Sequence, residues 1–516
     1  MLVSGFLEES ARRTPDAVAV IEPTRRTTYR ELDRMANRFG HLFRQHGVER
    51  GDRVVIALDN SLEMVAAYLG ALKAGAVAVL LPAGPRSDRL AHAVIDCAPR
   101  VAVIDAATAR TVTPGSPVSG VPHVFVVQPF ASQGVLPPFA GLAAALDECS
   151  EEPVRVRSID LDLAAIIYTS GSTGHPRGVM LTHRNFVVNA RSIATYLQLV
   201  AADRVMCVLP FYYVYGLSLL HTHLAVGGSL VIENRSAFPN VVLSTMQEHE
   251  VTGFAGVPST FALMLHRSNL EEARLPNLRY VTQAGGSMSP AWITEWQERG
   301  PKADFYVMYG ATEAAARLTY LSPADLPRKL GSIGRAIPNV EIVVLTESGE
   351  RAEAGEIGEL VARGSNISCG YWNNPEETAL RFGPMGYRTG DFGYADDEGY
   401  LYLVGRQHDM IKVGAHRVGV QEIENVLQSH PAVHEAAVVA APHELLVEAP
   451  VAFVVLRSTI DDIQNTLRAF CAGHLAPHKV PLRIVPQDDL PKLETGKLDR
   501  RALRAIAAAM RFEMQS

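Results

Sequence analysis

The 516-residue sequence is poor in cysteine and has no cysteine pattern that builds disulfides or binds metal. Its five cysteines are scattered, whereas a thiolate zinc site or a disulfide framework needs closely spaced pairs; they are Cys97, Cys149, Cys207, Cys369 and Cys471. The sequence also lacks an apolar run long enough for a membrane span, and charged residues occupy the N-terminal stretch where a signal peptide is apolar. We therefore expect a soluble, cytoplasmic protein with no membrane association.

The sequence also lacks a basic excess, because its net charge is −7 and its pI is near 6.2. A general nucleic-acid binder would show a clustered positive charge, so no nucleic-acid partner is expected. Hydrophobic residues make up 47% of the chain, enough to bury a large core. The length exceeds that at which one core stops growing, which predicts at least two domains.

The first half of the chain alternates helical and strand patterns. Residues 29–47 carry apolar side chains at the spacing of one helix face, and 64–74 read as a second helix. Residues 52–58 and 76–81 are short apolar runs typical of buried strands. This alternation predicts a doubly wound α/β architecture. Residues 106–158, rich in Pro, Gly, Ser and Val, are expected to form loops and edge strands.

The residue pattern changes in the second half of the chain and predicts further structural units. Glycines punctuate short β-rich segments from about residue 330, which indicates a β-rich subdomain over 330–404. Strand and helix patterns of a compact α+β domain follow. We predict an α/β and α+β multidomain fold with a large N-terminal domain over 1–404, a hinge at 405–409 and a small C-terminal domain over 410–516.

The sharpest local signal is a loop rich in Gly, Ser and Thr that leaves the end of an apolar strand. Backbone amides beside glycine, hydroxyl groups and a fixed positive charge together suit a polyphosphate. The Walker A spacing is absent, and a plain Ser/Gly turn is the structural alternative. The candidate phosphate-binding residues are Thr169, Ser170, Gly171, Ser172, Thr173, Gly174 and Arg177.

This loop resembles the signature of the adenylate-forming superfamily, which contains acyl- and aryl-CoA synthetases, adenylation domains of peptide synthetases, and luciferases. Further motifs follow in the family's order over nearly the whole chain. They are YGATE at 309–313, YRTGD at 387–391, GR at 405–406, the segment 411–418, and PKLETGK at 491–497. The resemblance implies that ATP activates a carboxylic acid to an acyl-adenylate, which then reacts with a thiol.

The resemblance gives roles to four residues of the nucleotide site. Tyr309 stacks on adenine, Thr312 donates to the α-phosphate, Glu313 holds the Mg²⁺ that ATP brings, and Asp391 accepts both ribose hydroxyls. Gly286 and Ser287 also belong to the implied nucleotide site. Taken alone, Tyr309 would be a core tyrosine, Glu313 a solvated helix-start charge and Asp391 an Asx-turn residue.

Three basic residues near and beyond the hinge complete the implied site. Arg406 and Arg417 are similar to family residues that contact ribose or phosphate, and Lys497 lies on a loop held by Pro and Gly. Carboxylate attack on the α-phosphorus brings two anions together, and one ammonium between them would orient both and stabilise the charge. In the family the small domain rotates after this step, which replaces the Lys497 loop by the loop around 412–417.

The sequence departs from the family at three positions outside the acyl pocket. Arg177 stands where lysine is common, and arginine preserves the charge. His408 occupies the hinge position where Asp or Lys is usual, which could change the rate of rotation. Ala415 replaces a glycine beside the pantetheine channel, so the fit of the thiol partner could differ.

The acyl pocket implied by the resemblance decides between substrate classes. Peptide-synthetase domains for α-amino acids place an aspartate near Val214, and valine cannot pair with an ammonium group. An aryl or aliphatic acid is therefore expected, with CoA as acceptor. The alternatives are an enzyme that loads a carrier-protein phosphopantetheine, a luciferase-like oxygenase, and a protein that binds a nucleotide without catalysing a reaction. The pocket residues are Tyr213, Val214, Gly256, Gly285 and Met308.

Overall fold

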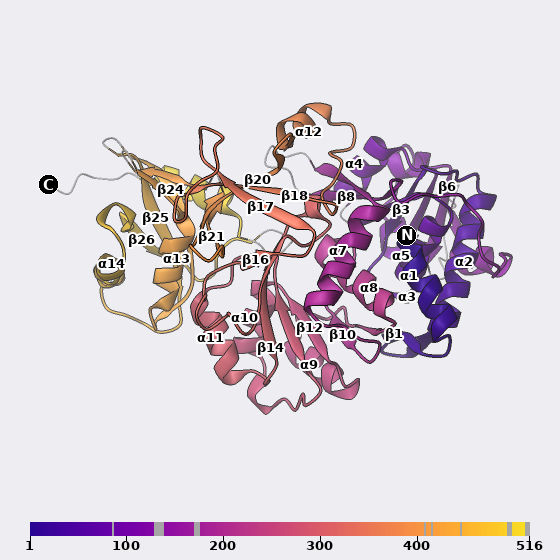
Figure 1. Ribbon diagram of the computed structural model, residues 1–516, viewed down its shortest axis with the longest axis horizontal. Helices are drawn as coiled ribbons and strands as arrows, with labels where there is room; N and C mark the ends of the chain where they lie inside the picture. Colours follow the sequence, from indigo (N-terminus) through magenta and orange to yellow (C-terminus); the bar gives the residue numbers. More distant parts are fainter. Residues whose placement is uncertain are drawn as a thin grey trace.

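The computed structural model describes residues 1–84, 87–127, 139–169, 176–406, 409–413, 416–443, 446–492 and 498–510. Two large sheets with helices form most of the molecule, a small antiparallel sheet follows them, and a fourth sheet ends the chain (Figure 1). The predicted α/β and α+β fold with a large and a small domain is confirmed.

The first large sheet is seven-stranded, in the order β7-β6-β5-β3-β4-β8-β9, and all its pairs except β8–β9 are parallel. Val54 and Ile56 on one face of β3 join the main core, while Val55 and Ala57 face the helix α4. Both faces are thus buried, which is why these strands read as continuous apolar runs. The bounds are β3 Arg53–Ala57, β4 Val77–Leu81, β5 Val101–Asp105, β6 His123–Val127, β7 Phe139–Gly141, β8 Leu163–Thr169 and β9 Arg177–Thr182.

The second large sheet is nine-stranded, in the order β16-β15-β14-β13-β12-β10-β11-β1-β2. Its central strands from β14 to β1 are parallel, and antiparallel strands close both edges. The bounds are β1 Val18–Glu22, β2 Arg25–Thr28, β10 Arg204–Cys207, β11 Ser229–Ile232, β12 Gly253–Gly256, β13 Tyr280–Gln283, β14 Asp304–Tyr309, β15 Thr319–Leu321 and β16 Arg335–Ala336.

Five helices pack in the core that the two large sheets share: α1 Ser4–Arg13, α2 Tyr29–Gln45, α3 Leu62–Lys73, α7 His183–Tyr196 and α8 Val214–Val226. The helices α2 and α3 approach so closely that a Cβ at Gly70 would overlap the Cβ of Phe39. The other helices and short 3-10 turns described before the antiparallel sheet are α4 Ser87–Cys97, α5 Ala106–Ala109, η1 Pro117–Gly120, α6 Leu142–Asp147, α9 Pro239–Glu248, α10 Pro258–Arg267, η2 Leu270–Glu272, α11 Pro290–Arg299 and η3 Thr312–Ala314.

The segment 106–158 forms strands at one edge of the first large sheet, as predicted, but it also contains helices that were not predicted. It contains the short helices α5 and α6 as well as strands β6 and β7. Asp105 caps α5 by accepting a hydrogen bond from the amide of Thr108 at 2.8 Å. A helix of four residues is too short to show a periodic apolar face, so the sequence pattern did not indicate it.

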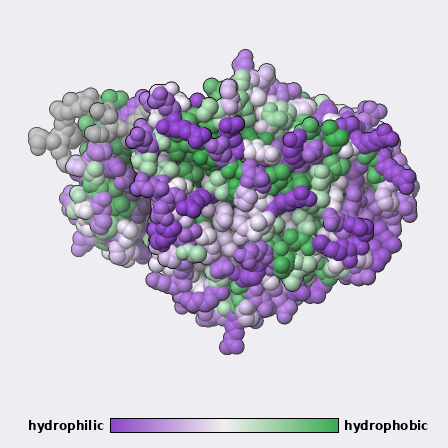
Figure 2. Space-filling model, viewed as in Figure 1, coloured by the Kyte–Doolittle hydropathy of each residue, from purple (hydrophilic) through white to green (hydrophobic). Residues whose placement is uncertain are grey.

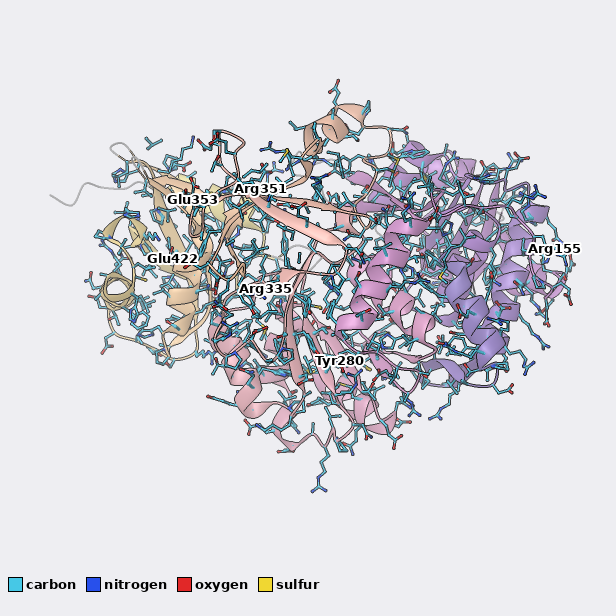
Figure 3. The ribbon with its side chains drawn as sticks, viewed as in Figure 1. Arg155, Tyr280, Arg335, Arg351, Glu353 and Glu422 are labelled. Carbon is cyan, nitrogen blue, oxygen red and sulfur yellow. The ribbon has the colours of Figure 1, made fainter. Side chains whose placement is uncertain are left out.

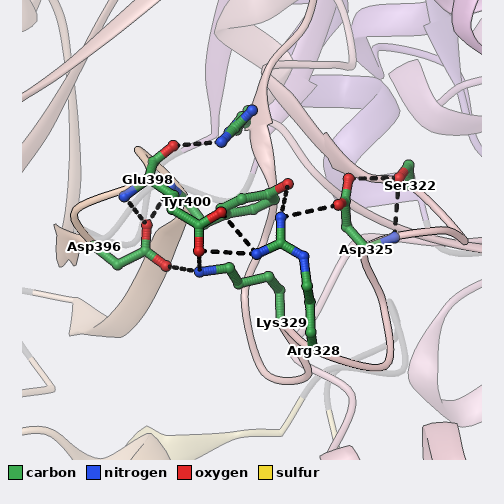
Figure 4. Close-up of polar contacts among 8 residues, drawn as sticks. Ser322, Asp325, Arg328, Lys329, Asp396, Glu398 and Tyr400 are labelled. Atoms are coloured by element: carbon green, nitrogen blue, oxygen red, sulfur yellow. Dashed lines mark hydrogen bonds and ion pairs between the residues drawn. The ribbon is translucent and has the colours of Figure 1, made fainter.

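The antiparallel sheet forms the predicted β-rich subdomain and is joined to the second large sheet by a network of charges (Figure 4). Lys329 lies 2.7 Å from Asp396 and 2.6 Å from Glu398. Arg335, on β16 between the two sheets (Figure 3), lies over the ring of Tyr400 at 4.1 Å. The network fixes the turn between β20 and β21. The bounds are β17 Val340–Leu345, β18 Gly358–Gly364, α12 Pro375–Arg381, β19 Phe382–Gly383, β20 Gly386–Ala395 and β21 Leu401–Arg406.

The C-terminal sheet has the order β23-β22-β25-β24, with β26 parallel to β25. Apolar side chains of α13 and α14 pack on one face, and those of α15 pack on the other. The bounds are β22 Ile411–Val413, β23 His416–Val418, α13 Val420–Ser429, β24 Val433–His443, β25 Val447–Leu456, α14 Ile463–His474, η4 Pro477–Lys479, β26 Arg483–Pro486 and α15 Arg500–Ala509.

The C-terminal sheet touches the second large sheet's helices through a small group of polar and aromatic side chains. His434 on β24 lies against Trp292 on α11 and His266 on α10, with ring centroids 6.1 and 5.1 Å apart. Arg457 lies 3.8 Å from Glu295 of α11. Polar and aromatic side chains thus link the C-terminal sheet to helices α10 and α11.

A buried ion pair should decide the stability of the C-terminal domain. Arg500, at the start of α15, binds both oxygens of Glu424 at 2.6 and 2.9 Å, and Glu424 is only 3% exposed. We expect Arg500→Met to lower the free energy of unfolding of this domain by about 3 kcal/mol, because it leaves a buried carboxylate unpaired. Urea unfolding followed by hydrogen exchange of β24 amides would measure the loss. Arg501→Met on the exposed face of α15 is the control, and equal stability of both variants would contradict the prediction.

Polar and apolar side chains are interspersed over the face seen in Figure 2. Across the described part of the chain, every helix is too short or too polar to cross a lipid bilayer.

Candidate active site

Four parallel strands of the second large sheet end at one edge, and the predicted acyl-pocket residues lie there. The strands β10, β12, β13 and β14 are neighbours in the order β14-β13-β12-β10. Residues beyond the carboxyl ends of adjacent parallel strands form the usual ligand crevice of such sheets. Tyr213 and Val214 follow β10, Gly256 ends β12, and Gly285 follows β13. Met308 is the last but one residue of β14.

The turn that carries Tyr213 and Val214 is held by an asparagine from the first large sheet's side. Asn60 donates from Nδ2 to the carbonyl of Leu209 at 2.9 Å and accepts from the amide of Phe211 at 2.8 Å. Asn60 is 6% exposed, so both bonds are shielded from water. The contact fixes where α8 begins and therefore the direction of Val214.

The turn after β13 is shaped by a glycine and a buried glutamine. Gly285 has φ +83°, a left-handed conformation that favours glycine. Gln283, only 1% exposed, donates from Nε2 to the carbonyl of Gly286 at 2.7 Å. Gly286 and Ser287 are exposed at this turn. Their backbone amides are thus available at the edge where the resemblance places the nucleotide.

The predicted adenine and ribose residues contact one another. The hydroxyl of Tyr309, at the end of β14, donates to Oδ2 of Asp391 at 2.5 Å, and Nε of Arg406 donates to Oδ1 at 3.0 Å. Burial and the Asp391 charge hold the pKa of the Tyr309 hydroxyl well above its ordinary value, so it stays a donor. The Asp391 charge in turn raises the pKa of Arg406. Three residues from β14, β20 and β21 thus form one site.

The predicted magnesium residue, Glu313, is held at one oxygen only. Tyr371 donates its hydroxyl to Oε1 of Glu313 at 2.7 Å, and no described residue donates to Oε2. No group of three His, Cys, Asp or Glu side chains that could hold a metal occurs among the residues the structure describes. One free carboxylate oxygen fits Mg²⁺ that arrives with phosphates, because Mg²⁺ takes one or two carboxylates and keeps its other ligands. Thr312 precedes Glu313 in η3.

Removing the hydroxyl of Tyr371 should weaken adenylation without touching the substrate. We expect Tyr371→Phe to lower kcat/KM for Mg-ATP about tenfold to a hundredfold, because a hydrogen bond to a charged group contributes about 1.5–3 kcal/mol. A positioning role predicts a higher Mg²⁺ requirement as well, measured by titrating Mg²⁺ at fixed ATP. Tyr402→Phe, on β21, is the control; an unchanged Mg²⁺ profile in Tyr371→Phe would contradict the role.

The predicted phosphate-binding loop lies between Thr169, the last residue of β8, and Arg177, the first of β9, which pair across the sheet. Arg177 lies 2.6 Å from Glu377 on α12 and 5.8 Å from the ring of Tyr371. Its charge therefore also ties the loop's end to the β-rich subdomain. Tyr168 is fixed by donating to Asp96 at 2.6 Å.

Several predicted residues lie outside the described residues. They are Ser170, Gly171, Ser172, Thr173 and Gly174 of the loop, His408 of the hinge, Ala415, and Lys497. Arg417 lies in β23, but its side chain is not described. The roles of all of these stay predictions.

Sequence reasoning missed two asparagines that position Glu313. Asn189 on α7 and Asn366 after β18 both donate to the carbonyl of Arg317, at 3.0 and 2.8 Å, and reach the carbonyl of Ala314. These bonds clamp the residues that follow η3. Nothing local marks either asparagine, because each meets its partner only through the tertiary fold.

Comparison with known proteins agrees with this arrangement. Residues 7–372 match the family of AMP-binding enzymes, and residues 422–497 match the AMP-binding enzyme C-terminal domain. The chain is 32% identical over 504 residues to a 2-succinylbenzoate–CoA ligase of Geobacillus kaustophilus, covering 97% of each chain. It is also 32% identical over 518 residues to a linear gramicidin synthase of Brevibacillus parabrevis, covering 98% of this chain and 6% of that one.

Among solved structures, an anthranilate CoA ligase, AuaEII, in complex with anthranoyl-AMP has a TM-score of 0.90. Its sequence is 26% identical, and the likeness covers 98% of this chain and 97% of that one. The family match spans well over half of the present chain, and the relatives cover nearly all of it. The resemblance seen in the sequence motifs is confirmed. This chain belongs to the family of AMP-binding, adenylate-forming enzymes.

Proposed function

We propose that this protein is an AMP-forming acid–thiol ligase. It would react a carboxylic acid with ATP to give an acyl-adenylate and pyrophosphate, and then transfer the acyl group to the thiol of CoA. The observation that supports the proposal is that Asp391 accepts hydrogen bonds from Tyr309 and Arg406, while Glu313 follows Tyr309 closely in the chain and is held at Oε1 by Tyr371. These residues would supply an aromatic ring for adenine, an acceptor for ribose and a carboxylate for magnesium. Similarity to named CoA ligases supports the same reaction.

Residues of both domains would have separate roles in the first step. Asp391 and Tyr309 would hold the nucleoside, Thr312 would donate to the α-phosphate, and Glu313 would hold Mg²⁺, which neutralises phosphate charge when bound. Lys497 would bring the acid's carboxylate and the α-phosphate together. The acid would lie along Val214, Gly285 and Met308, at the ends of the parallel strands.

Contacts on either side of the predicted hinge support a rotation between the two steps. Arg406 is tied to Asp391 of the N-terminal domain, whereas the carboxylate of Asp409 is tied to Arg504 on α15. Arg406 would therefore stay with the nucleotide site while Asp409 moves with the C-terminal domain. The pivot would fall between these two residues.

Pyrophosphate exchange tests the proposal. A panel of aryl, short-chain, medium-chain and β-amino acids should reveal acids that promote exchange between ATP and labelled pyrophosphate, with AMP as the nucleotide product. Mass spectrometry after addition of CoA should then detect the acyl-CoA. Formation of ADP and orthophosphate, or no AMP with any acid, would contradict the proposal.

The likeness to a segment of a gramicidin synthase favours a second acceptor. In this alternative the acyl group passes to the phosphopantetheine of a separate carrier protein. Thioester formation is measured with CoA and, separately, with a carrier protein whose phosphopantetheine thiol is free. The true acceptor should give the larger kcat/KM.

A further inference from the structure

A buried arginine with no counter-ion among the described residues follows the magnesium residue in the chain. Arg317 is 2% exposed, and its side chain is the largest of those that are fully buried. Its Nε has no hydrogen-bond partner, and Nη1 reaches the carbonyl of Ala316 at 3.5 Å. No carboxylate of the described residues forms an ion pair with it. A buried charge is normally paired, so this guanidinium calls for an anion that the described part of the chain does not supply.

The backbone holds Arg317 firmly in this position. Ala315 and Ala316 have φ of 52° and 116°, in the region that residues other than glycine rarely adopt. A Cβ at Gly310 would overlap the carbonyl oxygen of Ala316, so this turn also needs glycine at 310. The two clamping asparagines Asn189 and Asn366 bind the carbonyl of Arg317 itself. Strain that neighbouring contacts enforce is typical of functional positions.

Arg317 lies near two tyrosines, Tyr215 and Tyr196, and each of them adjoins a predicted acyl-pocket residue. Its guanidinium carbon is 4.6 Å from the ring centroid of Tyr215, which follows Val214 in α8. It also lies near Tyr196, whose hydroxyl donates to the sulfur of Met308 at 3.0 Å. Burial raises the pKa of Tyr196, and the Arg317 charge offsets part of that increase. Tyr215 thus links the arginine to Val214 along α8, and Tyr196 links it to Met308.

We propose that Arg317 is a specificity residue that binds a second carboxylate on the acid, so that the substrate class is a dicarboxylic acid. This inference rests on the proposed function, because it concerns the same acyl site. A planar guanidinium binds a carboxylate through two parallel hydrogen bonds, and its free Nε is one of the two donors needed. Val214 and Met308 offer apolar contacts to the carbon skeleton between the two carboxylates.

A purely structural role for Arg317 explains fewer of these observations than binding of an anionic group does. Stacking on Tyr215 gives a favourable cation–π contact, yet a ring does not satisfy the Nε–H donor or balance the charge. A core position that needed only volume would be filled better by leucine or methionine, as in the surrounding core. An anionic ligand group accounts for the charge, the free donor and the enforced backbone together.

The test compares acids that differ only by the second carboxylate. Adipate is paired with hexanoate, and phthalate with benzoate, in the pyrophosphate-exchange assay with the full-length protein. We expect at least one diacid to exceed its monoacid in kcat/KM by roughly a hundredfold. Arg317→Met should remove about that factor for the diacid while leaving or raising the rate with the monoacid, and Arg317→Lys should restore part of the preference. Arg26→Met, on the exposed edge strand β2, is the control and should leave both rates unchanged.

The possible outcomes distinguish failure of this inference from failure of the proposed function. Exchange with monoacids that equals or exceeds that with diacids in the unsubstituted enzyme overturns the inference and leaves the ligase function standing. Loss of both activities to the same degree in folded Arg317→Met also overturns it, because the residue would then not discriminate between acids. No exchange with any acid of either series overturns the proposed function and the inference together. Should Arg317→Met fail to fold, the preference of the unsubstituted enzyme and of Arg317→Lys decides.

Discussion

Substituting Lys497 by alanine should lower acid-dependent pyrophosphate exchange about a thousandfold, since one preorganised donor at a developing charge contributes about 3–4 kcal/mol. The same variant should form thioester from supplied acyl-AMP at close to the normal rate. In the first half-reaction, the acid's carboxylate must approach a negatively charged phosphate, and an ammonium between them offsets the repulsion. In the second, the thiol attacks an acyl carbon, and in the proposed mechanism the rotated domain would present a different loop. Paired assays of exchange and of thioester formation measure both steps.

Lys492 provides a matched control from the same segment. Its ammonium group binds Glu435 at 2.9 Å and Asp489 at 3.5 Å, so it is engaged within the C-terminal domain. Lys492→Ala should therefore retain exchange. Equal loss of both half-reactions in Lys497→Ala would contradict the two-step use of the domain, and undiminished exchange would contradict the role of the lysine.

Much of the fold could be predicted because parallel strands buried on both faces are unbroken apolar runs in the sequence. The run predicted at 76–81 is β4, Val77–Leu81, and the run predicted at 52–58 contains β3, Arg53–Ala57. The helix expected over 29–47 is α2, Tyr29–Gln45, whose capping box uses Thr28 and Glu31. Local chemistry fixes these elements, so local patterns in the sequence reveal them.

The residues that position the site could not be predicted in the same way. Asn366 is fully buried and binds carbonyls some fifty positions earlier in the chain, and Tyr371 reaches Glu313 from beyond β18. Arg317 lies a few residues after a recognisable motif, but its lack of a counter-ion among the described residues appears only when the neighbouring side chains are placed. Motifs predict which residues contact the nucleotide, whereas the fold shows which other side chains hold those residues in place.

Asp391→Asn should impair both half-reactions, in contrast to Lys497→Ala. The carboxylate accepts from Tyr309 and Arg406, and the resemblance makes it the acceptor for ribose hydroxyls. An amide loses the charge and presents a donor where donors already converge, so Arg406 is left unpaired. Hydrogen bonds to a charged group contribute about 1.5–3 kcal/mol each, and loss of one or two should lower kcat/KM for ATP about a hundredfold or more.

In the proposed mechanism the adenosine stays bound through thioester formation, which is why the second step should also suffer in Asp391→Asn. Exchange and the reaction of supplied acyl-AMP with CoA should fall together, mainly through weaker binding of the nucleotide. Asp397→Asn, on the exposed turn before Tyr400, removes a nearby charge without touching the site and should change neither rate. If Asp391→Asn slowed exchange alone, the carboxylate would serve only the adenylation step. Asp391 would then not be the group that holds the ribose, and the nucleotide site built around Tyr309 and Arg406 would have to bind the adenosine by another contact.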